Sequence, residues 1–248
     1  MARTVIVKLG GSVITDKSKP FSYRSDVVSA LAEEIASSDE KTLVVHGGGS
    51  FGHAVAKLEG ISSVEAAASA AAVSKTREAM YDLNRLLCRT MAENKLSPYS
   101  FSPFDVIVKA GKAPISRWLH GLQKFGLTPV TFGDVMLTPA GFKVLSGDLI
   151  VLELAKILEP ERCVFALDAD GVYEEGTRII IPELTPSRVK RMQVSKGDDV
   201  TGGMRLKLEV AAKVAALGTK VCFVSGYRRN EFSKALKGLE FYGTVVRS

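Results

Sequence analysis

The stretch His46-Gly47-Gly48-Gly49-Ser50-Phe51-Gly52-His53 decides the fold. It follows the apolar run 43–45 and precedes residues 54–58, which read as helix. Because glycine has no Cβ, an anion can closely approach the backbone N–H groups at such a strand-to-helix turn. The stretch therefore predicts a phosphate-binding loop between a strand and a helix.

Further glycine corners adjoin other regular segments. Gly10-Gly11-Ser12 comes directly after the apolar run 5–9, and Gly202-Gly203-Met204 opens a segment that reads as helix. Asp168-Ala169-Asp170-Gly171 ends another strand-like run with a turn. Ligands bind beyond the carboxyl ends of parallel strands. We therefore expect the Gly47–Gly49 loop and the Gly10–Gly11 corner to form one site that holds phosphate from two sides.

The composition is typical of a globular protein, with 46% hydrophobic and 24% charged residues in a chain of 248. The formal net charge of +6 suits an anionic substrate, whereas scattered basic residues argue against a nucleic-acid surface. We expect no signal peptide, because the N-terminus has no apolar signal region, and the sequence contains no apolar run of membrane-spanning length. Its three cysteines lack metal-ligand spacing and fit a reducing, cytoplasmic environment.

Strand-like and helix-like segments alternate, which predicts an α/β fold with a mostly parallel sheet covered by helices on both faces. The expected strands are 5–9, 42–46, 97–101, 128–132, 163–167, 220–224 and 243–246, with a hairpin around residues 138–141. The expected helices are 25–37, 64–94 with a break, 116–125, 148–158, 203–217 and 231–236. No repeat or linker marks a boundary, so we expect one domain, 1–248.

Three lysines lie near the glycine corners. Lys8 is inside the first apolar strand, on the same side as Gly10, and a buried lysine is costly unless it has a partner. Lys17 lies in a polar loop, where a solvated cation is the simpler interpretation, and Lys207 lies about one turn inside the helix after Gly203. Phosphoryl transfer needs positive charge and positioning, so these lysines are candidates for that chemistry.

Asp148 and two histidines complete the candidate residues. Asp148 is either a first-turn acid that complements a helix dipole or a carboxylate that aligns lysines, and the sequence leaves both interpretations open. His53 lies just inside the helix that the glycines open, where its imidazole can donate to a phosphate oxygen. His46 ends a buried strand, so we expect it to be structural. The motifs GxxxxGK[ST] and, after the first strand, GxGxxG are absent.

Taken in order, these motifs resemble the amino acid kinase superfamily. They are Lys8-Leu9-Gly10-Gly11-Ser12, the triple glycine, Asp168 to Tyr173, and Thr201-Gly202-Gly203-Met204 with Lys207, and they span almost the whole chain. Within the superfamily, residues 10–17 and 47–53, Phe132-Gly133-Asp134-Val135 and Ser146-Gly147-Asp148 resemble the archaeal isopentenyl phosphate kinases.

The resemblance implies an open αβα sandwich in which residues of about 1–160 bind the acceptor and about 161–248 bind the nucleotide. It implies phosphoryl transfer from ATP, with Mg²⁺, to isopentenyl phosphate. The implied catalytic residues are Lys8, Lys17, His53, Asp148 and Lys207. The implied acceptor site comprises Gly10, Gly11, Gly48, Gly49, Gly52, His53, Val135, Val144, Gly147 and Ile150. The implied nucleotide site comprises Lys8, Gly11, Ser12, Asp168, Asp170, Gly171, Tyr173, Gly202, Met204 and Lys207.

The implied chemistry needs no general base, because a phosphate monoester is already an anionic nucleophile. The obstacle is repulsion between two anions, which fixed cations and N–H dipoles offset while they hold the attacking oxygen in line. By the same resemblance, Asp148 would orient the lysines. His53 would hold the acceptor phosphate together with backbone N–H groups of Gly10, Gly11, Gly48 and Gly49.

An isopentenyl tail needs an apolar pocket, for which Val135, Val144 and Ile150 are the candidates by matching position. Val73 and Met80 could close this pocket, although we expect both to be ordinary core residues. Residues 65–72 are alanine-rich where the family is expected to be more polar and glycine-rich. The depth of the pocket therefore does not follow from the resemblance.

Two alternatives remain open. A related kinase for another small phosphate or phosphonate fits His53 almost as well, whereas a carboxylate acceptor would not need it. A nucleotide-sensing module without chemistry should lack Lys8, Asp148 or Lys207, and all three are present. The resemblance also implies a homodimer with a small-molecule substrate, and we expect neither a nucleic-acid nor a membrane partner.

Overall fold

The computed structural model describes residues 4–58, 69–104, 112–139, 141–192 and 203–248, without the side chains of 53, 54 and 56–58. Within these ranges one eight-stranded sheet has the order β3-β4-β2-β1-β7-β9-β10-β8. Its strands are β1 (Val5–Leu9), β2 (Thr42–His46), β3 (Pro98–Ser100), β4 (Thr128–Phe132), β7 (Arg162–Leu167), β8 (Glu183–Leu184), β9 (Lys220–Ser225) and β10 (Gly243–Val246).

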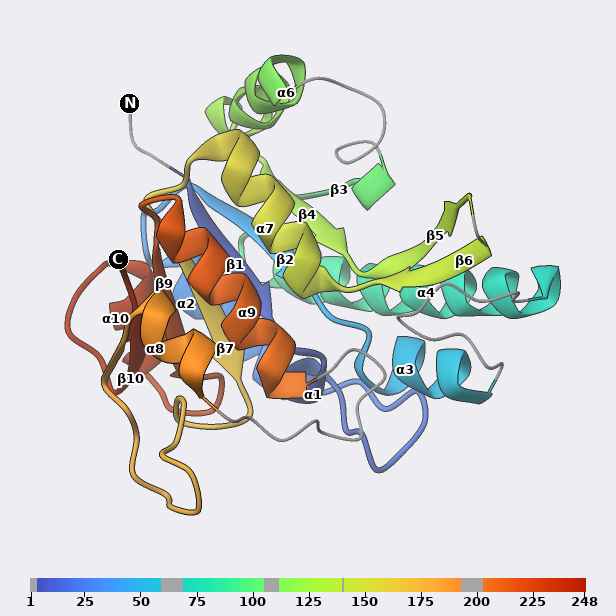
Figure 1. Cartoon of the computed structure of the whole chain (residues 1–248). Coiled ribbons are helices and arrows are strands. Elements are labelled where there is room, and N and C mark those ends of the chain that lie inside the picture. The colour runs from blue at the N-terminus through green and yellow to red at the C-terminus, as the bar shows by residue number, and fades with distance from the viewer. Residues whose placement is uncertain (1–3, 59–68, 105–111, 140, 193–202) are drawn as a thin grey trace.

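The sheet is mostly parallel, as predicted. Strand β1 lies at its centre and pairs in parallel with β2 on one side and with β7 on the other. The exception is at one edge, where β10 runs antiparallel to β9 and β8 runs parallel to β10. The carboxyl ends of β1, β2, β4 and β7 therefore lie at the same end of the sheet, where the loops that follow these strands meet (Figure 1).

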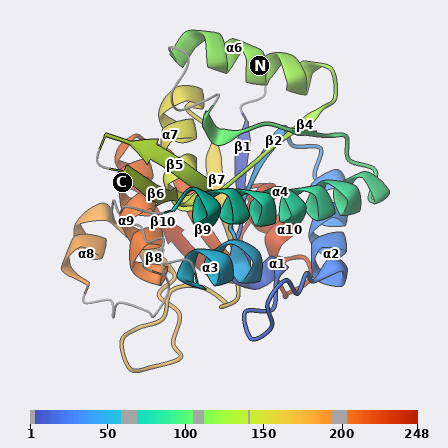
Figure 2. The same ribbon diagram turned by 90° about the vertical axis from the view of Figure 1, so that its right-hand side faces the viewer.

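Helices cover both faces of the sheet and complete an αβα sandwich (Figures 1 and 2). One face packs against α6 (Lys112–Lys124), α7 (Gly147–Leu158), α8 (Pro186–Arg191) and α9 (Gly203–Ala216). The other packs against α1 (Gly11–Ile14), α2 (Ser25–Ala36), α3 (Gly49–Leu58), α4 (Ala70–Glu93) and α10 (Glu231–Leu236).

Alternation along β1 assigns its side chains to these two layers. Val5, Val7 and Leu9 belong to the core beneath α1–α4, whereas Ile6 belongs to the core beneath α7 and α9. Because side chains two apart in a strand share a face, Lys8 lies on the same face as Ile6. The strand period therefore directs this lysine toward α7 and α9.

A hairpin of β5 (Asp134–Thr138) and β6 (Gly141–Leu145) stands outside the large sheet. It follows β4 almost directly and lies beside α4 (Figure 2). Val135 of the hairpin and Ala72 of α4 form a small apolar cluster, around which Val73, Phe142 and Val144 pack. The hairpin is thus held by side chains on α4 and not by the hydrogen bonds of the sheet.

Three short elements were not expected from the sequence, namely α1, α8 and β8. In α8, the Thr185 side chain accepts from the N–H of Arg188 and Pro186 occupies the first turn, so local capping explains this helix. Helix α4 begins after the cap Ser69, whose hydroxyl accepts from Ala72 N–H. The part of the expected 64–94 helix before Ser69 lies outside the described residues.

The two glycine corners touch each other through their backbones. A Cβ added at Gly11 would collide with the backbone nitrogen of Gly49, and a Cβ at Gly49 would collide with Thr15. Gly49 also has a φ of +48°, which disfavours a side chain. The close approach of β1 and β2 at their carboxyl ends therefore requires glycine at both positions.

We predict that Gly11→Ala lowers the free energy of unfolding by about 1–3 kcal/mol, because backbone atoms must move to admit the methyl group. Gly121→Ala is the matched control, since a Cβ there meets nothing within 4 Å. In the interior of α6 that change should stabilise the protein by about 0.5–1 kcal/mol. Denaturant titration of both variants measures the difference, and a wild-type midpoint for Gly11→Ala would contradict the described loop contact.

Candidate active site

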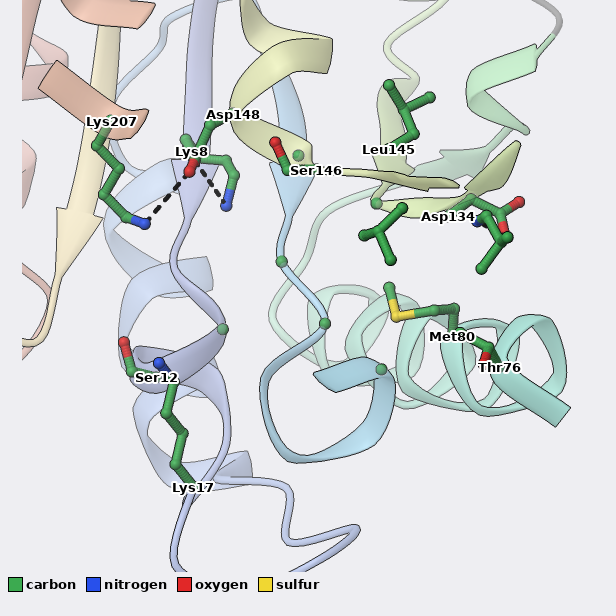
Figure 3. A pocket seen from close by; sticks show the side chains of 18 residues that line it. Lys8, Ser12, Lys17, Thr76, Met80, Asp134, Leu145, Ser146, Asp148 and Lys207 are labelled. Carbon is green, nitrogen blue, oxygen red and sulfur yellow. Dashed lines mark hydrogen bonds and ion pairs between the residues drawn. The ribbon is translucent and has the colours of Figure 1, made fainter. Parts of the chain in front are cut away.

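A pocket opens where the ends of β1, β2 and β4 meet the start of α7 (Figure 3). One end is lined by lysines and glycines and the other by apolar side chains from α4 and the β5–β6 hairpin. Its lining residues are Lys8, Gly11, Ser12, Lys17, Gly47, Gly48, Gly52, Thr76, Met80, Gly133, Asp134, Val135, Val144, Leu145, Ser146, Gly147, Asp148 and Lys207.

Two lysines from distant parts of the chain meet one buried carboxylate at the polar end. Lys8 Nζ lies 3.5 Å from Asp148 Oδ1, and Lys207 Nζ donates to Asp148 Oδ2 at 3.2 Å. The side chains of Lys8 and Asp148 are only 4% and 5% exposed. Burial by itself raises the pKa of Asp148, but the two ammonium groups outweigh it and hold the pKa below its usual value. The centre is therefore a buried, ionised Asp148 carboxylate that Lys8 and the partly buried Lys207 approach from two sides.

Local structure explains why these three side chains converge. Lys8 lies on the face of β1 that α7 and α9 cover, and Lys207 is one turn inside α9. Asp148 is in the first turn of α7, whose cap Ser146 accepts from the N–H of Leu149. Asp148 therefore lies both near the positive end of a helix dipole and between two lysines.

Glycines make room for the Lys8 side chain. A Cβ at Gly147 would lie 2.7 Å from Lys8 Cε, and a Cβ at Gly47 would lie 3.3 Å from Lys8 Nζ. Gly147 was expected at the site from the resemblance, whereas Gly47 was not. Larger residues at either position would displace the ammonium group from the pocket wall.

Backbone N–H groups surround the same end, but not all of the predicted ones are available. Gly11 and Ser12 open α1, so their N–H groups have no acceptor within the helix. Gly48 and Gly52 also line the pocket, whereas Gly49 does not. The prediction is wrong for Gly10, because its N–H donates to the Ala166 carbonyl at 3.1 Å.

His46 supports the glycine loop from behind. Its Nδ1 lies 3.0 Å from the Gly47 carbonyl oxygen, its Nε2 lies 3.3 Å from Asn84 Oδ1, and its ring stacks on Phe132 at 5.5 Å. Burial lowers the pKa of His46 to about 4, so the ring is neutral at physiological pH. The structure agrees with the expected structural role.

Two further predicted catalytic residues, Lys17 and His53, lie outside the Lys8–Asp148–Lys207 triad. Lys17 lines the pocket, and its side chain extends from an exposed loop toward Ser12 (Figure 3). The pocket therefore favours the site interpretation of Lys17 over that of a solvated loop cation. His53 lies within α3, but its side chain is outside the described part of the chain, so its role stays a prediction.

Not all of the tail-pocket candidates line the apolar end of the pocket. Val135 and Val144 line it, whereas Ile150 is fully buried in the core and lines no part of it. Met80 was expected to be a plain core residue, but it lines the pocket. A Cβ added at Gly52 would lie only 2.5 Å from the Met80 sulfur, which explains why glycine occupies position 52. The resemblance did not assign roles to Thr76, Gly133, Asp134, Leu145 and Ser146, which line the pocket as well.

Of the predicted nucleotide residues, Lys8, Gly11, Ser12 and Lys207 line this pocket, whereas Asp168, Asp170, Gly171 and Tyr173 lie in a turn after β7 and do not line it. The Asp170 carboxylate accepts two hydrogen bonds from Arg228, at 2.5 and 3.0 Å, and the Asp170 N–H donates to the Tyr173 hydroxyl. Gly171 packs against Thr244, where a Cβ would come within 2.8 Å. Asp168 is exposed, Met204 packs on the core, and Gly202 is outside the described residues.

The model of the amino acid kinase family matches residues 3–225, which is most of the chain. The chain belongs to the amino acid kinase family. It is 30% identical to the isopentenyl phosphate kinase of Methanocaldococcus jannaschii over 97% of each chain. It is 32% identical to that of Haloferax volcanii over 98% of each. The crystal structure of the Thermoplasma acidophilum isopentenyl phosphate kinase product complex superposes with a TM-score of 0.80, at 26% identity over 98% of this chain and 100% of that one.

We predict that acid destabilises the protein through His46. An unfolded histidine titrates near pH 6.5, whereas the buried ring has a pKa of about 4. Between these values the unfolded state binds more protons, so the free energy of unfolding falls as the pH drops. The loss attributable to His46 between pH 7 and pH 5 is about 2 kcal/mol.

Urea denaturation of the wild type, His46→Asn and His120→Asn between pH 5 and 7.5 measures this contribution. The exposed His120 serves as the control, since its ring stands on the surface of α6. We expect a flatter pH dependence for His46→Asn alone. Parallel curves for all three proteins would contradict a neutral buried His46.

Proposed function

We propose that this chain transfers the γ-phosphoryl group of ATP to isopentenyl phosphate, which yields ADP and isopentenyl diphosphate. The observation that carries the proposal is a single pocket with the Lys8–Asp148–Lys207 triad at one end and an apolar wall at the other. Such a pocket suits an acceptor with an anionic head and a short hydrocarbon tail. The isopentenyl phosphate kinase relatives, similar over nearly the full length, support the same acceptor.

In the proposed reaction an acceptor phosphate oxygen forms a bond to the γ-phosphorus while the bond from that phosphorus to the bridging oxygen breaks. The electron pair of the broken bond remains on the β-phosphate of ADP. Charge spreads over the transferring group, so the protein acts chiefly by positioning and by electrostatic stabilisation. Lys8 and Lys207 would supply the positive charge, together with Lys17, which also lines the pocket.

Asp148 would keep the two lysines separated and aligned before the substrates arrive. Its single negative charge leaves the buried corner with a net positive charge, which attracts phosphate groups without forcing two bare ammonium groups together. Backbone N–H groups of Gly11 and Gly48 would hold the acceptor phosphate, and we propose that His53 assists them. The tail would then extend toward Met80, Val135 and Val144.

The remaining assignments are also proposals. The nucleotide would lie over the C-terminal half, near the turn that Asp168 to Tyr173 form, and the acceptor over the N-terminal half of one domain. Mg²⁺ would enter as MgATP, because this ion is usually held by substrate phosphates and water with few protein ligands. Among the described residues no helix is long and apolar enough to cross a bilayer. The homodimer and the cytoplasmic location stay predictions.

We predict that a screen of acceptors with purified protein and MgATP will show the highest kcat/KM for isopentenyl phosphate. Dimethylallyl phosphate and longer alkyl monophosphates test the tail pocket, small phosphonates test the main alternative, and glutamate and UMP serve as controls. ADP release measures turnover. A preference for a phosphonate or for a carboxylate would contradict the proposed acceptor.

We predict that Lys207→Met lowers kcat by about 100-fold or more, because an ammonium group is lost where negative charge develops. Lys213→Met is the matched control, since Lys213 is exposed on the same helix. Steady-state kinetics compares the two variants, and circular dichroism checks that both fold. Equal turnover in the two variants would remove Lys207 from the mechanism.

A further inference from the structure

The apolar end of the pocket is built from two elements that the main sheet does not hold together. Helix α4 supplies Thr76 and Met80, and the β5–β6 hairpin supplies Asp134, Val135 and Val144 (Figure 3). The hairpin pairs only with itself among the described strands. Its distance from α4, and with it the width of the pocket, depends on side-chain contacts between them.

One ion pair crosses from α4 to the base of the hairpin. Arg77 Nη1 lies 2.7 Å from Asp134 Oδ2, and the Asp134 side chain is completely buried. Asp134 Oδ1 accepts from the N–H of Val135 at 2.8 Å, whereas Oδ2 makes the ion pair with Arg77 and has no hydrogen-bond partner among the described residues. The carboxylate is therefore fixed by its own strand on one side and by α4 on the other.

The guanidinium group of Arg77 is also held in place. It lies over the rings of Tyr81 and Phe104, at 5.6 and 5.5 Å from their centroids. Its second nitrogen donates to the Tyr81 hydroxyl at 3.2 Å. A planar group held by these contacts loses little further freedom when it pairs with a carboxylate.

We propose that Arg77 is a positioning residue whose ion pair with Asp134 clamps the hairpin onto α4 and so fixes the width of the tail pocket. This inference rests on the proposed function. Arg77 itself is absent from the pocket lining, whereas its neighbour Thr76 and its partner Asp134 belong to it. Arg77 would thus act on the acceptor through the wall and not by contact.

A second ion pair on the same helix provides the contrast. Arg85 lies 3.3 Å from Asp82, but both side chains are more than half exposed and belong to one helix. Exposed pairs of that kind contribute little. Arg77–Asp134 differs because its acid is buried and because it joins two separate elements. Arg85→Met is therefore the matched control for Arg77→Met.

The clamp also has a titration signature. Burial raises the pKa of Asp134 to about 6, and the Arg77 charge opposes this rise. The other charged or titratable side chains of the packed elements are Lys143 on β6 and, on α4, Lys75, Glu78, Tyr81, Asp82, Arg85, Cys88, Arg89 and Glu93. At pH 7.5 Asp134 is ionised and paired, and below about pH 6 it takes up a proton and the charge attraction is lost. Removal of Arg77 raises the pKa further.

The experiment compares two phosphate monoesters, one with a full isopentenyl tail and one with only a two-carbon tail. Isopentenyl phosphate is the substrate, and ethyl phosphate is a competitor whose inhibition of isopentenyl diphosphate formation gives its affinity. Both carry the same phosphate monoester, so the titration of the phosphate cancels in the ratio of the two affinities. That ratio reports the tail pocket alone. The proteins are the wild type, Arg77→Met, Arg77→Lys, Asp134→Asn and Arg85→Met.

At pH 7.5 we expect Arg77→Met and Asp134→Asn to raise the KM of isopentenyl phosphate by about 5-fold, as for the loss of one partly buried pair. The KM of ATP and the inhibition by ethyl phosphate should stay unchanged. Arg77→Lys should recover most of the loss, and Arg85→Met should match the wild type. The affinity for isopentenyl phosphate relative to that for ethyl phosphate should fall below about pH 6 in the wild type, whereas in Arg77→Met and Asp134→Asn, which lack the pair at every pH, it should stay low and show no such fall.

Two outcomes would overturn the inference alone. Wild-type KM values in Arg77→Met and Asp134→Asn would show that the pair does not shape the pocket. Equal losses for isopentenyl phosphate, ethyl phosphate and ATP would show a general structural role. If Arg77→Met does not fold, the KM of isopentenyl phosphate in Asp134→Asn, which preserves the size of the side chain, tests the clamp instead. A wild-type enzyme that is inactive on isopentenyl phosphate would instead overturn the proposed function, and this inference with it.

Discussion

Like charges do not gather in a protein interior unless a counter-charge holds them, and Asp148 is that counter-charge here. It pairs with Lys8 from the first strand and Lys207 from the last long helix. The glycines around Lys8 are a consequence, since Gly47 and Gly147 leave just the space that its side chain occupies. The polar end of the pocket therefore follows from one buried carboxylate and from the backbone that closes around it.

The two ends of the pocket depend on different parts of the fold. The polar end is built at the ends of sheet strands, where hydrogen bonds fix each backbone position. The apolar end lies between α4 and a separate hairpin, where packing and the Arg77–Asp134 pair determine the geometry. A change in the hairpin can therefore alter what the pocket accepts while the lysines keep their places.

Much of this architecture could be predicted from the sequence, because buried parallel strands need continuous apolar runs and glycine corners mark their ends. Tertiary contacts decide the rest. Helix α1 begins with glycine, a poor helix former, and forms where its loop packs against α3. Met80 and Ile150 are both buried apolar residues on helices, and only packing decides that Met80 faces the pocket. The bond from Gly10 to Ala166 likewise depends on which strands are neighbours.

Strand β1 is hydrogen-bonded to β2 on one side and to β7 on the other, so one unbroken lattice of main-chain bonds runs beneath both proposed substrate regions. Neighbouring strands in such a lattice stand about 4.8 Å apart. The distance between the proposed acceptor and nucleotide regions is then set by the spacing of the strands beneath them. The continuous hydrogen bonding of β2, β1 and β7 leaves no hinge between the two regions. Any motion that admits substrate or releases product must therefore come from elements outside the main sheet, such as α3 and the β5–β6 hairpin.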